Sequence, residues 1–210
     1  MQKVELTLDQ VIERAKSLTN SGRKILGITG APGAGKSTIA KSIVERLGAN
    51  LCAFAPMDGF HLSNATLTAE GKISRKGALD TFDGEGYVNL LTRLRTLTEE
   101  VVHAPDYYRS FEESIGSALP IRREVPLVVT EGNYLLFNEG PWAKVKGLLD
   151  ECWFIDLEED IRIDRLIKRH IAVGKSPDDA EKWSRGSDQK NAEAVIALRE
   201  RADLLITLRD

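Results

Sequence analysis

Five short apolar runs recur along the chain, and each of them predicts a β-strand. Each run is apolar almost throughout instead of alternating with polar residues. This pattern is typical of strands that are buried on both faces of a parallel sheet. The runs cover residues 24–29, 51–57, 125–130, 152–157 and 204–208.

The segments between these runs repeat apolar residues at the spacing of an α-helix. A capping box opens the first of them, because Gln10 follows Thr7 by three residues. Strands that alternate with helices predict an α/β fold, here a three-layer α/β/α sandwich around a mainly parallel five-stranded sheet. The length of 210 residues suits a single domain over residues 1–210. The predicted helices cover residues 7–19, 37–47, 87–97, 141–149, 160–173 and 176–201.

Two long segments, residues 59–86 and 103–124, lack any sustained period. Irregular loops of this length in a compact domain are usually functional, so we expect both to contact substrate. A lid is expected over about residues 162–186, where Gly174 separates two helical patterns.

The stretch GITGAPGAGKST at residues 27–38 carries the clearest chemical signal. It contains G-x-x-x-x-G-K-S, the phosphate-binding loop (P-loop), between a predicted strand and a predicted helix. Its glycines let backbone N–H groups turn toward phosphate oxygens at a helix N-terminus. An ordinary glycine-rich turn has no need of a Lys-Ser pair, so we expect a nucleotide site. The expected nucleotide-binding residues are Gly30, Ala31, Pro32, Gly33, Ala34, Gly35, Lys36, Ser37 and Thr38.

Two of these residues have expected roles in phosphoryl transfer: Lys36 at the β- and γ-phosphates, and the Ser37 hydroxyl on Mg²⁺. Asp58 and Glu131 end two other predicted strands and should face the same crevice, because ligands bind outside the carboxyl ends of parallel strands. Asp58 is the candidate general base for an acceptor hydroxyl, although an Asp-Gly pair also suits a plain turn. Glu131 is the candidate metal-side acid, the alternative being a polar strand end.

Basic residues recur on one face of a predicted helix, at Arg162, Arg165 and Arg169. A mobile basic element can close over a triphosphate and stabilise charge in the transition state. The alternative is a solvated face paired with nearby acids. Arg169 lies nearest Gly174, and we assign it to the lid as a catalytic candidate.

The first irregular segment mixes aromatic and polar residues, which suits a small polar substrate. The expected substrate-binding residues are His61, Lys76, Asp83 and Arg109. Two of them have structural alternatives, since His61 can pack within the loop and Asp83 can cap the helix that follows.

Composition excludes some classes of function. A net charge of −3 and a pI of about 5.8 imply no general affinity for nucleic acid. No apolar run approaches the roughly 20 residues of a membrane span, and the N-terminus lacks a signal-peptide core, so we expect a cytoplasmic protein. Cys52 and Cys152 lie in apolar runs and are expected in the core rather than in a disulfide or zinc site. If the chain associates, a homodimer is the default expectation.

The motifs GAPGAGKST, MDGFH, RKGALDTFD, APDYYR, VVTEGNYLL and RLIKRH with GKS occur in this order. Together they resemble the family of uridine kinase, phosphoribulokinase and bacterial pantothenate kinase, from about residue 27 to the last predicted strand. Within that family the chain most resembles proteins described as fructose transport system kinases, a sugar-kinase-like branch. The resemblance implies ATP and Mg²⁺ as cofactors. It also implies that Asp58 acts on the acceptor hydroxyl, Asp83 contacts substrate, Glu131 lies at the metal and Arg169 lies in the lid.

The chain departs from uridine kinases, which carry Asp-Ser-Phe-Tyr where this sequence has Asp-Gly-Phe-His at 58–61. A nucleoside acceptor is therefore disfavoured. Residues 186–188 and Asn191 also resemble the sugar-kinase-like branch, with their role open between adenine-side packing and a helix start.

The function predicted from these features is ATP-dependent transfer of the γ-phosphate to a hydroxyl of a small metabolite, a fructose-like sugar. The alternatives are a pantothenate or nucleoside kinase of the same family, or a nucleotide-binding regulatory ATPase or sensor without a small acceptor. No Asn-Lys-x-Asp guanine motif is present, and a pure sensor has no need of Asp58 and Glu131.

Overall fold

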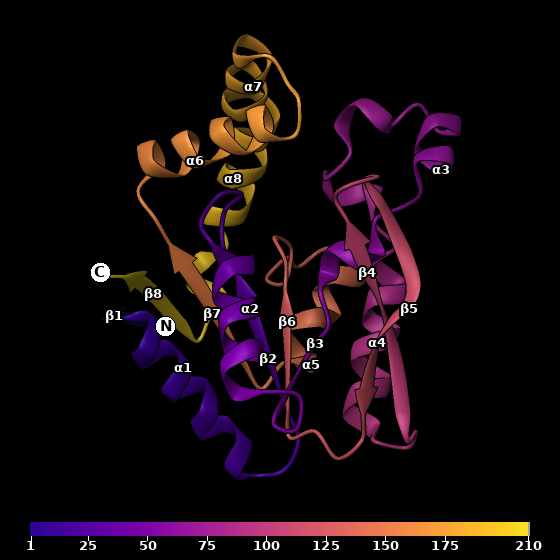
Figure 1. The fold of residues 1–210 in the computed structure, drawn as a ribbon, viewed down its shortest axis with the longest axis vertical. Helices are drawn as coiled ribbons and strands as arrows, with labels where there is room; N and C mark the ends of the chain where they lie inside the picture. The colour runs from indigo at the N-terminus through magenta and orange to yellow at the C-terminus, as the bar shows by residue number, and fades with distance from the viewer. Residues whose placement is uncertain (210) are drawn as a thin grey trace.

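The core of the computed structural model, which describes residues 1–209, is a six-stranded parallel sheet (Figure 1). Its strands lie in the order β1-β8-β7-β2-β6-β3, and all neighbours run parallel. This confirms the α/β fold, with one strand more than the five expected. The strands are β1 (Gln2–Leu6), β2 (Lys24–Thr29), β3 (Cys52–Phe54), β6 (Leu127–Glu131), β7 (Glu151–Asp156) and β8 (Leu204–Leu208).

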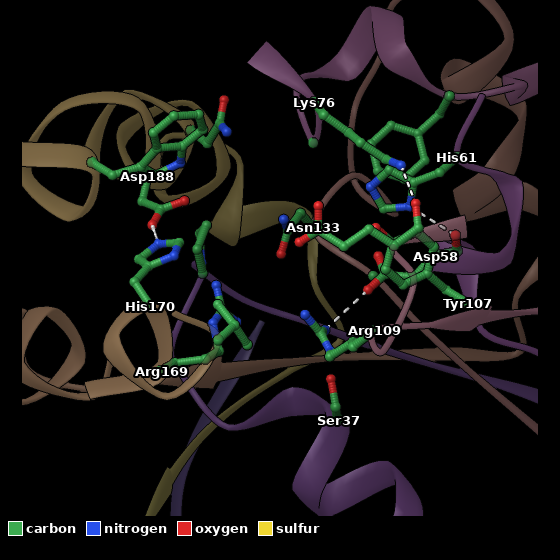
Figure 2. A pocket seen from close by; sticks show the side chains of 18 of the residues that line it. Ser37, Asp58, His61, Lys76, Tyr107, Arg109, Asn133, Arg169, His170 and Asp188 are labelled. Carbon is green, nitrogen blue, oxygen red and sulfur yellow. Dashed lines mark hydrogen bonds and ion pairs between the residues drawn. The ribbon is translucent and has the colours of Figure 1, made fainter. Parts of the chain in front are cut away.

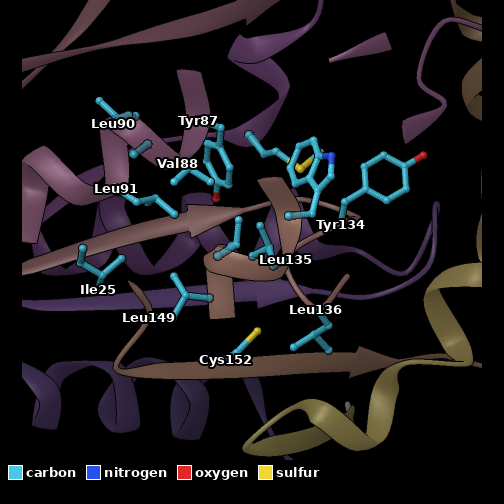
Figure 3. Packing of buried hydrophobic residues seen from close by; sticks show 14 of the residues in the cluster. Ile25, Tyr87, Val88, Leu90, Leu91, Tyr134, Leu135, Leu136, Leu149 and Cys152 are labelled. Carbon is cyan, nitrogen blue, oxygen red and sulfur yellow. The ribbon is translucent and has the colours of Figure 1, made fainter. Parts of the chain in front are cut away.

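Helices cover both faces of this sheet. Successive residues of a strand point to opposite sides, and those of β2 are apolar on both, so each side needs a layer of helix to bury it. Leu26 and Ile28 pack in the cluster that contains α1 and α2, whereas Ile25 packs in the cluster that contains α4. Figure 3 shows Tyr87 and Leu91 of that second cluster. The two layers of helix are α1 (Leu8–Ser17) and α2 (Lys36–Leu47) on one face, with α4 (Gly84–Thr96) and α5 (Val145–Leu148) on the other.

The predicted start of the first helix is confirmed in detail. The Thr7 side chain accepts a hydrogen bond from the Gln10 backbone N–H, and the Gln10 side chain accepts one from Thr7 N. Cys52 and Cys152 are both buried, as expected for core residues. Within residues 1–209, none of the helices is both long and apolar enough to cross a membrane.

Three strands of the structure were not predicted. β1 lies at the edge of the sheet beside β8 and alternates charged and apolar residues over positions 3–6, so it lacks the apolar run used to recognise strands. The prediction of an irregular segment at 103–124 is wrong. It forms most of an antiparallel hairpin, β4 (Val101–Tyr108) and β5 (Glu113–Arg122), with a bulge between Ala104 and Asp106.

The segment at 59–86 contains more regular secondary structure than expected. The helix predicted near the C-terminus is shorter than expected and is interrupted. A short helix, α3 (Asn64–Ala69), is capped by Ser63, and 3₁₀ turns occupy much of the rest of this segment. The single helix predicted at 176–201 is two helices joined by a π-helical turn at Ser184–Asp188. The remaining elements are α6 (Glu159–Ala172), α7 (Pro177–Trp183), α8 (Gln189–Ile196) and the 3₁₀ turns Leu18–Asn20, Met57–Phe60, Ile73–Arg75, Leu79–Thr81, Gly140–Lys144 and Arg199–Arg201.

Candidate active site

The carboxyl ends of three adjacent strands, β2, β6 and β3, meet at one cavity of about 390 Å³. The P-loop follows β2, Glu131 ends β6, and Asp58 follows β3. Figure 2 shows Asp58, His61 and Lys76 on one wall and Arg169, His170 and Asp188 opposite. The predicted site residues that line this cavity are Pro32, Lys36, Ser37, Asp58, His61, Lys76, Arg109, Glu131 and Arg169.

The P-loop backbone is shaped by glycines that no other residue could replace without strain. Gly30 has φ +150° and Gly33 has φ +85°, both in the region that disfavours side chains. A Cβ on Gly33 would lie 2.8 Å from the Arg162 carbonyl oxygen, and one on Gly30 would lie 2.6 Å from the Ile155 carbonyl oxygen. The loop is therefore held against β7 and α6 in a form that only glycine allows.

Gly33→Ala is expected to weaken ATP binding and stability together, because the added methyl must push the loop away from α6. Gly22→Ala is the matched control: Gly22 also has positive φ, at +67°, but a Cβ added there would meet nothing within 4 Å. The control should lose only the ~1–2 kcal/mol of a left-handed alanine. The measurements are thermal unfolding and ATP titration of both variants. Equal effects of the two on ATP affinity would contradict this account of the loop.

Lys36 is almost fully buried at the first turn of α2, with 7% of its surface exposed. Its Nζ donates to the Ala31 carbonyl oxygen at 3.0 Å. Burial lowers the pKa of this ammonium to about 8, against the opposing attraction of Glu131 and Asp58. A buried cation that is held by one carbonyl of the P-loop is well placed to receive phosphate oxygens.

Ser37 and Glu131 form a contact across the floor of the cavity. The Ser37 hydroxyl donates to Glu131 Oε1 at 3.0 Å. Burial raises the pKa of the Glu131 carboxyl, and the nearby Asp58 charge raises it further. The pair presents a hydroxyl and a carboxylate oxygen together, which is the hard-oxygen set that Mg²⁺ prefers.

Asp58 lies at the start of the 3₁₀ turn after β3, with about a quarter of its side chain exposed (26%). Arg109, from the tip of the β4–β5 hairpin, places Nη2 3.5 Å from Asp58 Oδ2. The Asp58 backbone carbonyl lies 2.7 Å from His61 Nδ1. Burial lowers the pKa of His61, so its neutral form is favoured, with Nδ1–H donating to that carbonyl and Nε2 left as an acceptor.

The wall continues from His61 through Tyr107 to Lys76. The His61 ring lies between those of Phe82, at 4.0 Å, and Tyr107, at 4.6 Å between centroids. Lys76 Nζ lies 5.2 Å from the centre of the Tyr107 ring. Substrate-loop and hairpin residues thus form one continuous surface beginning at Asp58.

Of the three arginines predicted on one helix face, Arg169 lines the cavity, and Arg162 and Arg165 do not. Arg162 is 1% exposed and donates to the Pro32 carbonyl and to the Gln189 side chain, so it ties the P-loop to α8. This contradicts both interpretations given above, a mobile cation and a solvated face. Arg165 is exposed and lies beside Gly35, its Nη1 being 3.6 Å from the position that a Cβ on this glycine would take.

Asp83 is the predicted substrate residue that the cavity does not include. Its carboxylate accepts a hydrogen bond from Gly86 N at 2.8 Å and caps α4, which favours the capping alternative. Asp188 and Asn191, whose role was open, line the cavity, and Asp188 Oδ2 lies 2.7 Å from His170 Nε2. Glu112, Asn133 and Trp183 also line it without having been predicted as site residues. For Asn133 a signal was available, since it lies within the motif VVTEGNYLL, two residues after the strand end at Glu131.

A P-loop between a parallel strand and a helix, with carboxylates after the next two strands of the sheet, β6 and β3, defines a nucleotide-binding site of the P-loop class. The model of the phosphoribulokinase/uridine kinase family matches residues 25–206, and the chain belongs to this family. It is therefore a small-molecule kinase.

Similar proteins agree with this assignment. The chain is 36% identical over 152 residues to the ATP-dependent kinase-like protein notR' of Aspergillus versicolor, covering 68% of this chain and 88% of that protein. It is 29% identical over 214 residues to the uncharacterized protein YggC of Escherichia coli, covering 100% of this chain and 88% of the other. A solved structure of a "putative fructose transport system kinase" from Silicibacter sp. TM1040 has 33% identity and a TM-score of 0.84, over 95% of this chain and 98% of that one.

Proposed function

We propose that this kinase transfers the γ-phosphate of ATP to a hydroxyl of a small sugar-like metabolite, with Asp58 as the general base. The observation that carries the proposal is the meeting of Lys36, Glu131 and Asp58 in one cavity at the ends of adjacent strands. Similarity to a solved protein described as a fructose transport system kinase supports a sugar as acceptor. Preference for ATP rests on the family alone.

The P-loop residues fit a nucleotide triphosphate. The positive φ angles of Gly30, Gly33 and Gly35 give the loop the turns from which backbone N–H groups would meet phosphate oxygens at the start of α2. The proposed nucleotide-binding set is residues 30–38, with Lys36 at the transferred phosphate and Arg169 opposite it on the lid. These cations stabilise charge that spreads over the phosphate oxygens in the transition state.

The donor set of Ser37 and Glu131 fits Mg²⁺, because the two oxygens already lie 3.0 Å apart. When bound, the ion would supply positive charge to the phosphate oxygens. Removal of divalent cations is therefore expected to stop turnover.

Asp58 would orient the acceptor hydroxyl and accept its proton. A bond forms between the acceptor oxygen and the γ-phosphorus, and the bond from that phosphorus to the oxygen shared with the β-phosphate breaks. Arg109 Nη2 lies 3.5 Å from Asp58 Oδ2, so this ion pair can hold the carboxylate in place beside the acceptor. His61, Lys76 and Arg109 would contact the rest of the acceptor, since all three line the cavity beside Asp58.

The test is ADP release from ATP and Mg²⁺ across a panel of sugars, polyols, sugar phosphates, pantothenate and uridine. An acceptor that raises the rate far above background supports the proposal and names the substrate. A response to pantothenate or uridine alone would replace the sugar by the acceptor of a related kinase. Background hydrolysis that no acceptor changes would favour the regulatory ATPase or sensor.

The wider organisation is also proposed. We infer a single kinase domain over residues 1–210, with substrate segments at 59–86 and 103–124 and a lid at about 162–186. A homodimer and a cytoplasmic location remain expectations from the sequence. Size-exclusion chromatography with light scattering would measure the first directly.

A further inference from the structure

The charge of the cavity differs from that of the whole chain, which carries a net charge of −3. Nine charged side chains line the cavity beside two histidines, and lysines and arginines outnumber carboxylates. The cations are Lys36, Lys76, Arg109, Arg169 and Lys175, and the acids are Asp58, Glu112, Glu131 and Asp188.

Most of these cations lack a carboxylate partner. Among the ion pairs of residues 1–209, Arg109 pairs with Asp58, and Lys36, Lys76, Arg169 and Lys175 occur in none. The proposed function assigns Lys36 and Arg169 to the nucleotide phosphates, and Lys175 lies on the lid, 4.2 Å from the centre of the Trp183 ring. Lys76 is then the unpaired cation on the wall that holds Asp58.

Lys76 is held in place by neutral groups. Its Nζ donates to Asn64 Oδ1 at 2.6 Å and to the Glu112 backbone carbonyl at 2.5 Å, over the face of Tyr107. An ammonium has three N–H donors, so one is left for a ligand in the cavity. Burial lowers the pKa of Lys76 more than Glu113 and Glu112 raise it, which means that its positive charge is only partly compensated.

A chain of side-chain and backbone contacts connects Asp58 to Lys76 and fixes their relative positions. Asp58 contacts His61, the His61 ring contacts Tyr107, and Tyr107 lies under Lys76. An acceptor that lies along this wall has its reacting hydroxyl at Asp58 and its far end at Lys76. His61 lines the same cavity, and its Nε2 is left as an acceptor that suits a second hydroxyl.

We propose that the acceptor is an anionic polyol, with a carboxylate or phosphate bound by Lys76 at the end opposite the reacting hydroxyl. This inference rests on the proposed function and narrows its substrate class. A neutral sugar offers no opposite charge to Lys76. A sugar acid or a sugar phosphate supplies one, as a charge-assisted hydrogen bond.

The test compares acceptors that differ only in the anion: sorbitol with gluconate, glycerol with glycerate and glycerol 3-phosphate, and fructose with fructose 6-phosphate. We expect an anionic member to exceed its neutral twin in kcat/KM. The carboxylate and phosphate arms tell which anion is used. Lys76→Gln should lower kcat/KM for that acceptor by about 10- to 100-fold, chiefly through KM, and should lower it clearly less for the neutral twin, so that the preference for the anion is lost.

Lys72→Gln is the matched control, since Lys72 belongs to the same segment but pairs with Glu70 and Asp80 outside the cavity. It should leave both acceptors unchanged. Calorimetric titration of the acceptor into enzyme with a non-hydrolysable ATP analogue gives the same comparison without turnover. A neutral twin that serves equally well, or a Lys76→Gln variant that loses both twins equally, would overturn the anion site and leave the kinase proposal standing. No acceptor-dependent ADP release at all would overturn both.

Discussion

Asp58→Asn is expected to lower kcat by about 100- to 10,000-fold, the usual contribution of a positioned general base. An amide keeps the shape of the carboxyl and can still orient a hydroxyl, but it cannot take the proton. ATP affinity should stay within a few fold, because Asp58 follows β3 and the P-loop follows β2. The measurements are acceptor-dependent ADP release and ATP titration of the same preparation.

Asp106→Asn is the matched control for this substitution. Asp106 lies in β4, where its carboxylate accepts a hydrogen bond from Tyr107 N, and it does not line the cavity. An amide oxygen can accept the same bond, so turnover should be near that of the unaltered enzyme. Turnover of Asp58→Asn within a few fold of normal would show that another group takes the proton.

The P-loop and its two neighbouring carboxylates could be predicted because each depends on local sequence and one rule of topology. The strand at 24–29 is predicted with the bounds that β2 has in the structure. The rule that ligands bind at the carboxyl ends of parallel strands then predicts that Asp58 and Glu131 face the P-loop, without any knowledge of side-chain packing. That β2, β6 and β3 are neighbours was not predicted, and this order is what brings Lys36, Glu131 and Asp58 together.

The prediction failed where tertiary contacts decide what a residue does. Helical spacing alone placed Arg162 with Arg165 and Arg169, and it could not distinguish the side chain that is buried against the P-loop. The hairpin at β4 and β5 was missed because Pro105 and a bulge beside it interrupt the alternation of Val102 and Ala104. Arg109 lies beside Asp58 because the hairpin places it there, so the local sequence pattern could not predict this contact.

Lys36→Met is expected to lower kcat by about 100- to 1,000-fold, the cost of removing one preorganised donor from developing charge. ATP affinity should also fall, since Lys36 lies at the head of the P-loop helix. Lys41→Met, on the exposed side of the same helix α2, is the matched control and should be neutral in both assays. Normal turnover of Lys36→Met would show that this lysine does not take part in phosphoryl transfer.

The same substitution is expected to leave the unliganded protein as stable as before, or more so. The folded pKa of Lys36 is lowered from 10.5 to about 8 by burial, so folding opposes its charge. Below about pH 8 the side chain is charged in both states, and the folded protein bears the full cost of a buried ammonium. As the pH rises from about 8 toward 10.5, the folded state loses the proton first, and stability rises. Lys36→Met should lack this rise in a denaturant titration repeated across that pH range. A less stable variant with an unchanged pH dependence would contradict this account. It would mean that Lys36 stabilises the unliganded P-loop instead of destabilising it through its buried charge.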